Sequence, residues 1–204
     1  MQDKNFWNNN WSTWQEDFKP SPFAEKAFKL MKIKDMHDVL DLGCGKGRNS
    51  LFFAANGMNV TAMDISDEAL KTVENLKHPK ITTVCADIAR ADLGKEKYDA
   101  VFACLSLHYF GDAVTRLIIQ NVFQALRGGG FFFVRCKSVK DRFYGIGEKV
   151  GEDMYFDEMT RHFFRPEYMQ DVLSDFETVA VTECEEDYFG PCAFVDGFAS
   201  KALS

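Results

Sequence analysis

Short apolar segments alternate with amphipathic helical segments along the first 136 residues of this chain. The apolar segments are nearly continuous, which is typical of strands that are covered on both faces of a parallel sheet. They are residues 39–43, 59–64, 81–85, 98–105 and 131–136, and the helical segments between them are residues 49–56, 66–76 and 113–126. Strand and helix in alternation predict a three-layer α/β/α domain with a doubly wound, Rossmann-like sheet.

The pattern changes after residue 137. Residues 138–165 are polar, contain glycine and many aromatic residues, and show no clear periodicity. Pro166 then opens a helix that we expect to reach residue 173. Residues 178–184 and 193–203 follow as two strands joined by a turn at Gly190. We expect this hairpin to complete a seven-stranded, mostly parallel sheet with an antiparallel C-terminal strand.

The length of 204 residues favours one domain. We expect four parts in it: an N-terminal aromatic lid (1–35), a cofactor-binding core (36–137), a cap insertion (138–165), and a C-terminal helix and strand hairpin (166–204).

Composition excludes several classes of protein. The net charge of −7 disfavours non-specific nucleic-acid binding, which needs basic side chains at the phosphates. No window approaches the ~18 apolar residues that a membrane helix needs, and the N-terminus is unlike a secretory signal. The six cysteines are scattered without a CxxC pair, so we expect buried thiols rather than disulfides or a zinc site. We therefore expect a cytoplasmic protein with no metal, no nucleic-acid partner and no membrane segment.

The most informative motif is the glycine-rich stretch DLGCGKG at residues 41–47. It follows the first predicted strand and precedes the first predicted helix, at the carboxyl edge where doubly wound sheets bind ligands. Glycines allow the backbone to turn tightly and to approach a ligand closely. The spacing is GxGxG, whereas a nicotinamide-binding loop has GxGxxG.

Acidic residues at three strand ends add to this motif. Asp64 ends the second predicted strand, where a carboxylate can accept hydrogen bonds from both ribose hydroxyls. Asp87 follows the third strand and can accept from the exocyclic amine of adenine. Asp41, beside the glycines, can hold a cationic amine. The set suits an adenosine attached to a charged amino acid.

This arrangement resembles the class I S-adenosylmethionine-dependent methyltransferases over residues 36–136, and the final hairpin fits that family's reversed seventh strand. The resemblance implies S-adenosylmethionine as the cofactor. It places the glycine loop at the methionine end, Asp64 at the ribose, Ile65 and Ile88 on the adenine, and residues 104–106 near the sulfonium. The implied cofactor-binding residues are Asp41, Gly43, Cys44, Gly45, Gly47, Asn49, Asp64, Ile65, Asp87, Ile88, Cys104 and Leu105. The stretch GKGRNSLFFAANG is also similar to tellurite-resistance-type methyltransferases.

The segment after the fourth strand, CLSLHYF, lacks the Asn/Asp-Pro-Pro-aromatic motif of enzymes that methylate nucleobases or glutamine. His108 in this segment is the candidate general base, which must lie within hydrogen-bond reach of the acceptor. The alternative is a histidine that only packs beside the cofactor.

The insertion and the N-terminus supply further candidates. His162 is a second candidate catalytic residue, and Tyr144 and Arg161 are candidate substrate-binding residues; alternatively this stretch is a solvated loop. Trp7, Trp11 and Trp14 are spaced by roughly one helical turn, and we expect a lid or an aromatic cage from them, or simple packing on the core.

The leading hypothesis is a monomeric or homodimeric methyltransferase that acts on a small molecule and releases S-adenosylhomocysteine. Methylation of a macromolecule, non-catalytic binding of S-adenosylmethionine, and an NAD-dependent oxidoreductase are the alternatives.

Overall fold

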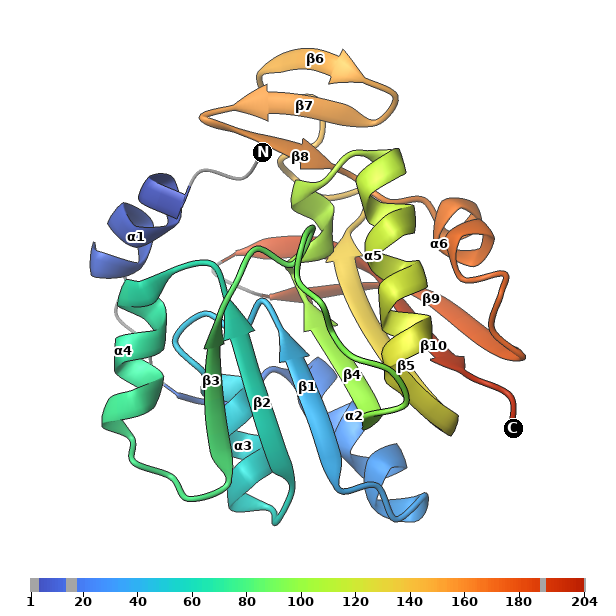
Figure 1. The fold of residues 1–204 in the computed structure, drawn as a ribbon. Coiled ribbons are helices and arrows are strands. Elements are labelled where there is room, and N and C mark those ends of the chain that lie inside the picture. The colour runs from blue at the N-terminus through green and yellow to red at the C-terminus, as the bar shows by residue number, and fades with distance from the viewer. Residues whose placement is uncertain (1–3, 14–17, 188–189, 204) are drawn as a thin grey trace.

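A seven-stranded sheet runs through the centre of the computed structural model, which describes residues 4–13, 18–187 and 190–203 (Figure 1). The strand order is β3-β2-β1-β4-β5-β10-β9. Neighbours from β3 to β5 pair in parallel, whereas β10 is antiparallel to both β5 and β9. The strands are β1 (Asp38–Leu42), β2 (Asn59–Asp64), β3 (Ile81–Cys85), β4 (Tyr98–Cys104), β5 (Leu126–Lys137), β9 (Thr178–Asp187) and β10 (Pro191–Ser200). The predicted sheet, with its reversed C-terminal strand, is confirmed.

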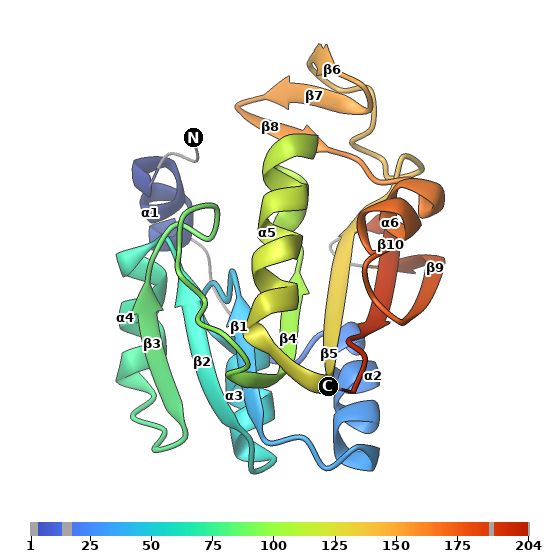
Figure 2. The ribbon, with the colours of Figure 1, turned by 45° about the vertical axis from the view of Figure 1, so that its right-hand side comes forward.

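Helices cover both faces of this sheet and give the three layers (Figure 2). One face packs against α2 (Pro22–Ile33), α3 (Arg48–Ala55) and α4 (Asp67–Asn75), and the other against α5 (Asp112–Ala125) and α6 (Pro166–Val172). Successive side chains of a strand point to opposite faces, so Phe102 and Phe133 join the first cluster while Val101 and Phe132 join the second. This two-sided burial explains why the central strands β1, β4 and β5 are largely apolar.

Side-chain caps fix where two of the helices begin. The Ser21 hydroxyl accepts from the backbone N–H of Ala24 at 3.1 Å, and Pro22 occupies the first turn of α2. The Ser66 hydroxyl accepts from the N–H of Ala69 at 3.2 Å at the start of α4. Each cap satisfies a helical donor that otherwise has no partner in the helix.

The junction between α5 and β5 differs from the sequence-based expectation of a strand that begins at residue 131. The helix ends at Ala125 and β5 begins at Leu126, which pairs with Tyr98. The register then shifts, so that Ala100 pairs with Phe131 and the three glycines lie in the irregular stretch between the two pairs. Glycine is favoured at such a bulge because it tolerates close backbone approach.

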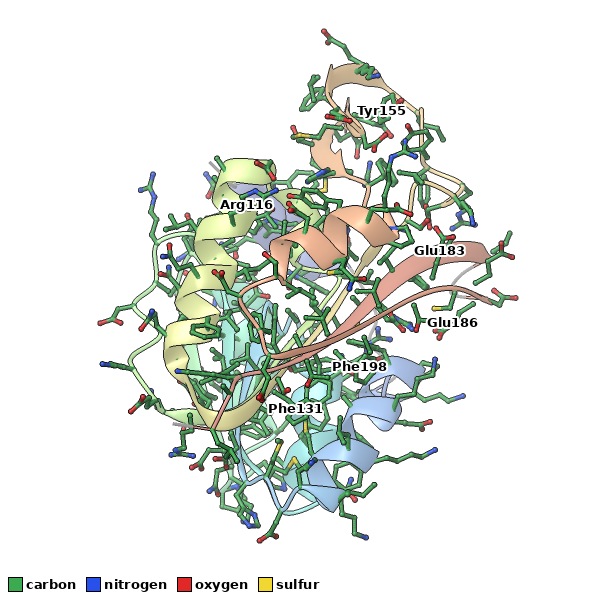
Figure 3. All side chains as sticks on the ribbon, turned by 90° about the vertical axis from the view of Figure 1, so that its right-hand side faces the viewer. Arg116, Phe131, Tyr155, Glu183, Glu186 and Phe198 are labelled. Atoms are coloured by element: carbon green, nitrogen blue, oxygen red, sulfur yellow. The ribbon has the colours of Figure 1, made fainter. Side chains whose placement is uncertain are left out.

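The outer strand β9 protects the open edge of the sheet with charge. Glu183 and Glu186 project from it, as Figure 3 shows. Glu183 pairs with Lys140, and Glu186 binds the buried guanidinium of Arg135 at 2.6 and 2.9 Å. Charged residues on an edge strand oppose pairing with another chain.

The insertion forms a small antiparallel sheet above the carboxyl ends of the parallel strands, at the top of Figure 1. We call it the cap sheet: β6 (Glu148–Gly151), β7 (Met154–Asp157) and β8 (Met159–His162). Asp153 and Glu158 turn the chain between these strands with φ of 49° and 60°. Strands of four residues are too short to show a period in the sequence, which is why residues 138–165 gave no strand signal.

Helix α1 (Lys4–Thr13) lies at the same edge of the sheet as the cap sheet, beside α4 (Figure 1). Lys4 forms an ion pair with Asp67, and the Ser66 hydroxyl donates to the side-chain oxygen of Asn8 at 2.7 Å. These contacts hold α1 over the carboxyl ends of the strands. Within the part of the chain that the structure describes, no helix is both long enough and apolar enough to cross a bilayer.

Candidate cofactor and active site

A crevice lies at the carboxyl ends of β1, β2 and β4, under α1. This is the edge of a doubly wound sheet at which ligands bind. We call it the cofactor crevice, and its walls include Gly43, Asp64, Ile65, Ile88, Leu105 and Trp11. The structure thus brings together residues from distant parts of the sequence, such as Trp11 and Ile88.

The glycine loop is held in a conformation that side chains would disturb. Gly43, Gly45 and Gly47 have φ of 80°, 54° and 83°, a region that residues with a Cβ rarely adopt. A Cβ on Gly47 would lie 2.7 Å from Val73 of α4, and one on Gly43 would collide with Ser106. The N–H groups of Gly43 and Cys44 both donate to the carbonyl of Met63, at 2.8 and 2.9 Å. The loop is therefore pinned to the end of β2.

Asp64 connects this loop to helix α4. One carboxylate oxygen accepts from the N–H of Gly45 at 2.8 Å and the other from the N–H of Ser66 at 2.9 Å. Asp64 is 7% exposed, and burial raises its pKa, while the backbone N–H groups of Ser66, Gly45 and Ile65 oppose that rise. A carboxylate has about four acceptor sites, so acceptor capacity remains for a hydroxyl donor in the crevice.

Asp41 lies beneath the loop at the end of β1. It accepts a hydrogen bond from the Ser50 hydroxyl at 2.5 Å and is 2% exposed. Burial raises its pKa to about 7, and the charge of Asp64 adds to that effect, whereas the Ser50 hydrogen bond and the charge of Arg48 oppose it. A cation brought near the loop would favour the ionised form of this carboxyl.

The comparisons with known proteins agree with this geometry. Residues 39–130 match the model of a methyltransferase domain family. A probable S-adenosyl-L-methionine-dependent methyltransferase, TehB of Haemophilus influenzae, is 31% identical over 103 residues, which cover 49% of this chain and 36% of that protein. An uncharacterized methyltransferase of Synechocystis sp. is 29% identical over 110 residues, covering 54% of this chain and 51% of that one. The chain thus spans about half or less of the length of these curated relatives.

The family model and these relatives support the class I S-adenosylmethionine-dependent methyltransferase family for this chain. The crystal structure of Haemophilus influenzae TehB superposes with a TM-score of 0.69 at 20% identity, covering 97% of this chain and 66% of that one. The Burkholderia thailandensis 1,6-didemethyltoxoflavin-N1-methyltransferase superposes with a TM-score of 0.75 at 16% identity, covering 98% of this chain and 87% of that one. At these identities the superpositions show a common fold. The cofactor of the family is S-adenosylmethionine, and an NAD-dependent oxidoreductase, which the sequence left open, is not supported.

Two tryptophans of α1 divide the cofactor crevice. The part beside Asp64 measures about 50 Å³, and the part beside Asn49 and Cys104 measures about 210 Å³. The indole of Trp11 rests on the loop, with ring carbons 2.7 Å from where a Cβ of Gly45 would be. Trp7 lines both parts. Small-molecule sites usually enclose about 300 Å³ or more, and each part of the crevice is smaller than that. Trp11 therefore occupies space that a bound cofactor would need. Trp14 lies outside the described residues.

Of the remaining cofactor candidates, Asn49, Cys44 and Cys104 line the larger part of the crevice, whereas Asp87 is not among the described residues that line either part. Asn49 accepts from the N–H and the hydroxyl of Ser21, at 3.0 and 3.1 Å. Cys44 and Cys104 line the crevice, and burial raises the pKa of the Cys104 thiol to about 11. Asp87 accepts from the N–H of Ala89 at 3.0 Å and so orders the turn that carries Ile88 into the crevice.

Leu105 forms part of the crevice floor with a strained backbone. Its φ is 58°, a region that leucine rarely adopts. Its N–H donates to the carbonyl of Arg135 in the neighbouring strand at 2.9 Å, which holds it there. Strain of this kind persists where the surroundings fix the backbone, and it concentrates at functional sites.

His108 lies in the short 3-10 helix η1 (Leu107–Tyr109) and is fully buried. Its ring packs on that of Tyr109 with 4.1 Å between centroids. Among the described residues neither ring nitrogen finds a hydrogen-bond partner. Burial holds the pKa of the imidazole well below its usual range, and the charges of Lys137 and Arg161 act in the same direction. His108 is therefore a neutral imidazole behind the crevice wall.

Tyr109 is a site residue that the sequence analysis missed. Together with Trp7 it lines both parts of the crevice, and the two rings meet edge to face with 4.8 Å between centroids. Burial raises the pKa of its phenol, which therefore stays protonated. Its position directly after His108, in the turn after the fourth strand, was the signal that could have identified it.

The candidates in the cap lie away from the crevice walls given above. His162 is buried, its Nδ1 lies 3.2 Å from the carbonyl oxygen of Phe110, and its ring packs against Phe164 and Tyr168. Burial lowers its pKa.

The two cap residues expected to bind substrate are engaged within the cap. The Tyr144 hydroxyl donates to Asp153 at 2.6 Å, and this bond raises the pKa of the phenol to about 12. The Arg161 guanidinium lies 3.8 Å from Asp157 and over the ring of Phe143. Their roles in substrate binding stay predictions. Across residues 4–13, 18–187 and 190–203, no group of three or more His, Cys, Asp or Glu side chains could hold a metal ion.

Proposed function

We propose that this protein transfers a methyl group from S-adenosylmethionine to a small-molecule acceptor and releases S-adenosylhomocysteine. One observation carries the proposal: a cavity of about 440 Å³ adjoins the cofactor crevice and shares Trp7 and Tyr109 with it. That volume lies within the range of small-molecule sites. The superposed 1,6-didemethyltoxoflavin-N1-methyltransferase was solved with 1,6-didemethyltoxoflavin and S-adenosylhomocysteine bound, which supports a small acceptor.

The residues of the crevice fit the cofactor. Asp64 has acceptor sites left for the ribose hydroxyls, and Ile65 and Ile88 offer an apolar slot for the adenine. The glycine loop would receive the methionine end, with Asp41 beneath it. When bound, the cofactor supplies an electrophilic methyl group on a sulfonium. The protein's part is then to align the acceptor with that methyl group and to exclude water.

Two binding and transfer experiments test this function. Calorimetric titration with S-adenosylmethionine, S-adenosylhomocysteine and NAD should give micromolar binding for the first two and none for NAD. When the protein is incubated with a cell extract and S-adenosylmethionine radiolabelled in its methyl group, the label should then appear in the small-metabolite fraction and not in the protein or RNA fraction. Label in the macromolecular fraction would contradict the small-molecule acceptor.

Cofactor binding is expected to displace Trp11 from the glycine loop, because its ring fills the space above Gly45. All three tryptophans lie in residues 7–14, so intrinsic tryptophan fluorescence reports on this segment alone. Saturation with S-adenosylmethionine should change the emission, with the same midpoint as in calorimetry. Trp11→Phe should remove a large share of the change. Unaltered emission at saturating cofactor would show that Trp11 stays on the loop.

His108→Leu should make the protein more stable. The imidazole buries two nitrogens without a partner among the described residues, and each such group costs about 1–3 kcal/mol. Leucine removes that cost, and we expect the free energy of unfolding in urea to rise by about 1–2 kcal/mol. A loss of stability would show that the nitrogens are bonded in solution.

The same variant separates the two roles proposed for His108. As a general base it would contribute about 100-fold or more to turnover and almost nothing to cofactor affinity. Equal losses in methyl transfer and in S-adenosylhomocysteine binding would instead identify a residue that packs the site.

A further inference from the structure

The cavity that adjoins the cofactor crevice is lined by residues of α1, η1, the start of α5 and the cap sheet. Phe6 and Trp7 come from α1, Tyr109 and Val114 from η1 and the start of α5, and Met154 and Phe156 from the cap sheet. We call it the cap cavity. Trp7 and Tyr109 belong both to it and to the cofactor crevice, so these two rings form the partition between the two spaces.

The wall of the cap cavity is aromatic and thioether-rich. Phe6, Trp7, Tyr109 and Phe156 supply rings, and Met154 and Met159 supply two polarisable sulfur atoms. Methionine sulfur packs favourably on aromatic rings, and methionine side chains adapt to irregular shapes. Such a wall offers contact area to a flat, apolar molecule.

Charge is almost absent from this wall. No lysine, arginine or histidine is among the described residues that line it, and its one acid, Glu158, is exposed. An anionic acceptor would lose water without gaining a cation, and a buried unpaired charge is strongly unfavourable. A cationic acceptor would meet a carboxylate only at the exposed end.

The nearest cation of the cap sheet, Arg161, is not among the residues that line the cavity. In an antiparallel pair, residues directly opposite each other share a face. Phe156 is opposite Thr160, and both line the cavity, whereas Tyr155 is opposite Arg161 on the other face. Tyr155, labelled in Figure 3, packs on Tyr144 instead.

The cavity also leaves apolar surface open to solvent. Phe156 is 47% exposed and Val114 is 36% exposed, although both line it. Covering this surface is favourable by about 25 cal/mol per Å². An occupant with an apolar ring would gain this contribution, whereas a small hydrophilic metabolite would not.

We infer that the methyl acceptor is an uncharged aromatic molecule, whose ring lies in the cap cavity and whose nucleophilic atom faces Trp7 and Tyr109. This inference rests on the proposed function. The acceptor atom forms the new bond to carbon as the carbon–sulfur bond of the sulfonium breaks. The sulfur keeps that electron pair, and a proton carried by the acceptor atom passes to a base or to water.

Three matched probes test the charge of the acceptor, with the protein saturated in S-adenosylhomocysteine. They are 2-naphthol, 6-hydroxy-2-naphthoate and 6-(aminomethyl)-2-naphthol, which share one ring system and differ in charge. We expect 2-naphthol to bind about ten-fold or more tightly than either charged probe. Equal or tighter binding of a charged probe would overturn the inference, as would failure of all three to bind. Failure of S-adenosylhomocysteine itself to bind would instead contradict the proposed function.

Two lysine variants place the probe in the cap cavity. Phe156→Lys introduces a cation into the wall. It should increase the affinity for 6-hydroxy-2-naphthoate relative to that for 2-naphthol by about ten-fold. Val150→Lys is the matched control, because Val150 is also 47% exposed on the cap sheet but is not part of the wall. The control should leave the ratio within about two-fold. A ratio that does not respond to Phe156→Lys, in a variant with native circular dichroism, would overturn the assignment.

Discussion

Asp64→Ala is expected to weaken S-adenosylmethionine binding by about ten- to a hundred-fold and to lower the free energy of unfolding by about 2–4 kcal/mol. The carboxylate accepts from the N–H groups of Gly45 and Ser66, both in buried surroundings. Its removal leaves those donors without an acceptor. It also removes the oxygens proposed to bind the ribose.

Asp64→Asn separates the two effects. An amide has one acceptor oxygen, so it can satisfy either Gly45 or Ser66 while its NH₂ group faces the other donor. We expect a smaller loss of stability than for alanine, but a similar loss of cofactor affinity. Calorimetry for binding and urea unfolding for stability give the two readouts.

Asp92→Ala provides the control. Asp92 lies in the segment after β3 and, like Asp64, accepts from a backbone N–H, that of Gly94 at 2.9 Å, but it is exposed and lies outside the crevice. Cofactor affinity should be unchanged in this variant. Unchanged affinity in Asp64→Ala as well would show that the ribose is held elsewhere.

Much of the core was predictable because its signals are local. The central strands β1, β4 and β5 are largely buried on both faces and therefore largely apolar, and the turn after β1 carries glycines because its backbone adopts positive φ. The bounds of β2 and β3 agree with the expected ranges, 59–64 and 81–85. The loop glycines were identifiable because positive φ and close packing leave little alternative.

The parts that were not predictable depend on long-range contacts. The direction in which cap residues point follows from the register of β7 and β8, and four-residue strands give no register in the sequence. Tyr144 and Arg161 were therefore chosen by residue type, whereas the cavity is lined by Met154 and Phe156.

The burial of His108 was equally hidden. Its position after β4 suggested an accessible base, but η1 turns its ring behind Tyr109. A sequence position at a strand end gives the neighbourhood of a side chain and not its access to solvent.

Asp41→Asn should stabilise the protein at pH 8 by about 4 kcal/mol and change little at pH 4. The pKa of Asp41 rises from an ordinary value of 3.8 to about 7 in the folded state, chiefly through burial. Between these values the folded protein holds a proton that the unfolded chain has lost. The contribution of Asp41 to the free energy of unfolding is therefore fully present below about pH 4 and is lost as the pH rises through 7. Asparagine keeps an acceptor for Ser50 and has no charge to bury.

The difference in free energy of unfolding between wild type and Asp41→Asn isolates the contribution of Asp41. His108 has the opposite pH dependence, but it is present in both proteins. The lowered pKa of His108 costs stability as the pH falls below about 6.5, and that cost cancels in the difference. Urea unfolding across pH 4–8 gives the difference curve. Equal curves for the two proteins would show that Asp41 ionises normally in the folded state.

Ser50→Ala should change the pKa of Asp41 in a known direction. The Ser50 hydroxyl stabilises the charged carboxylate at 2.5 Å, so its removal should raise the pKa of Asp41 further. The decline in stability still begins near pH 4 but should then extend to a higher pH. A cofactor amine near Asp41 acts in the opposite sense, because it favours the ionised form. With saturating S-adenosylmethionine, the free energy of unfolding of the wild type should therefore fall less steeply with pH above pH 5. The Asp41→Asn variant should show the same pH dependence of stability with and without the cofactor. The buried acid would then be a site whose cost to stability is recovered when a cation binds.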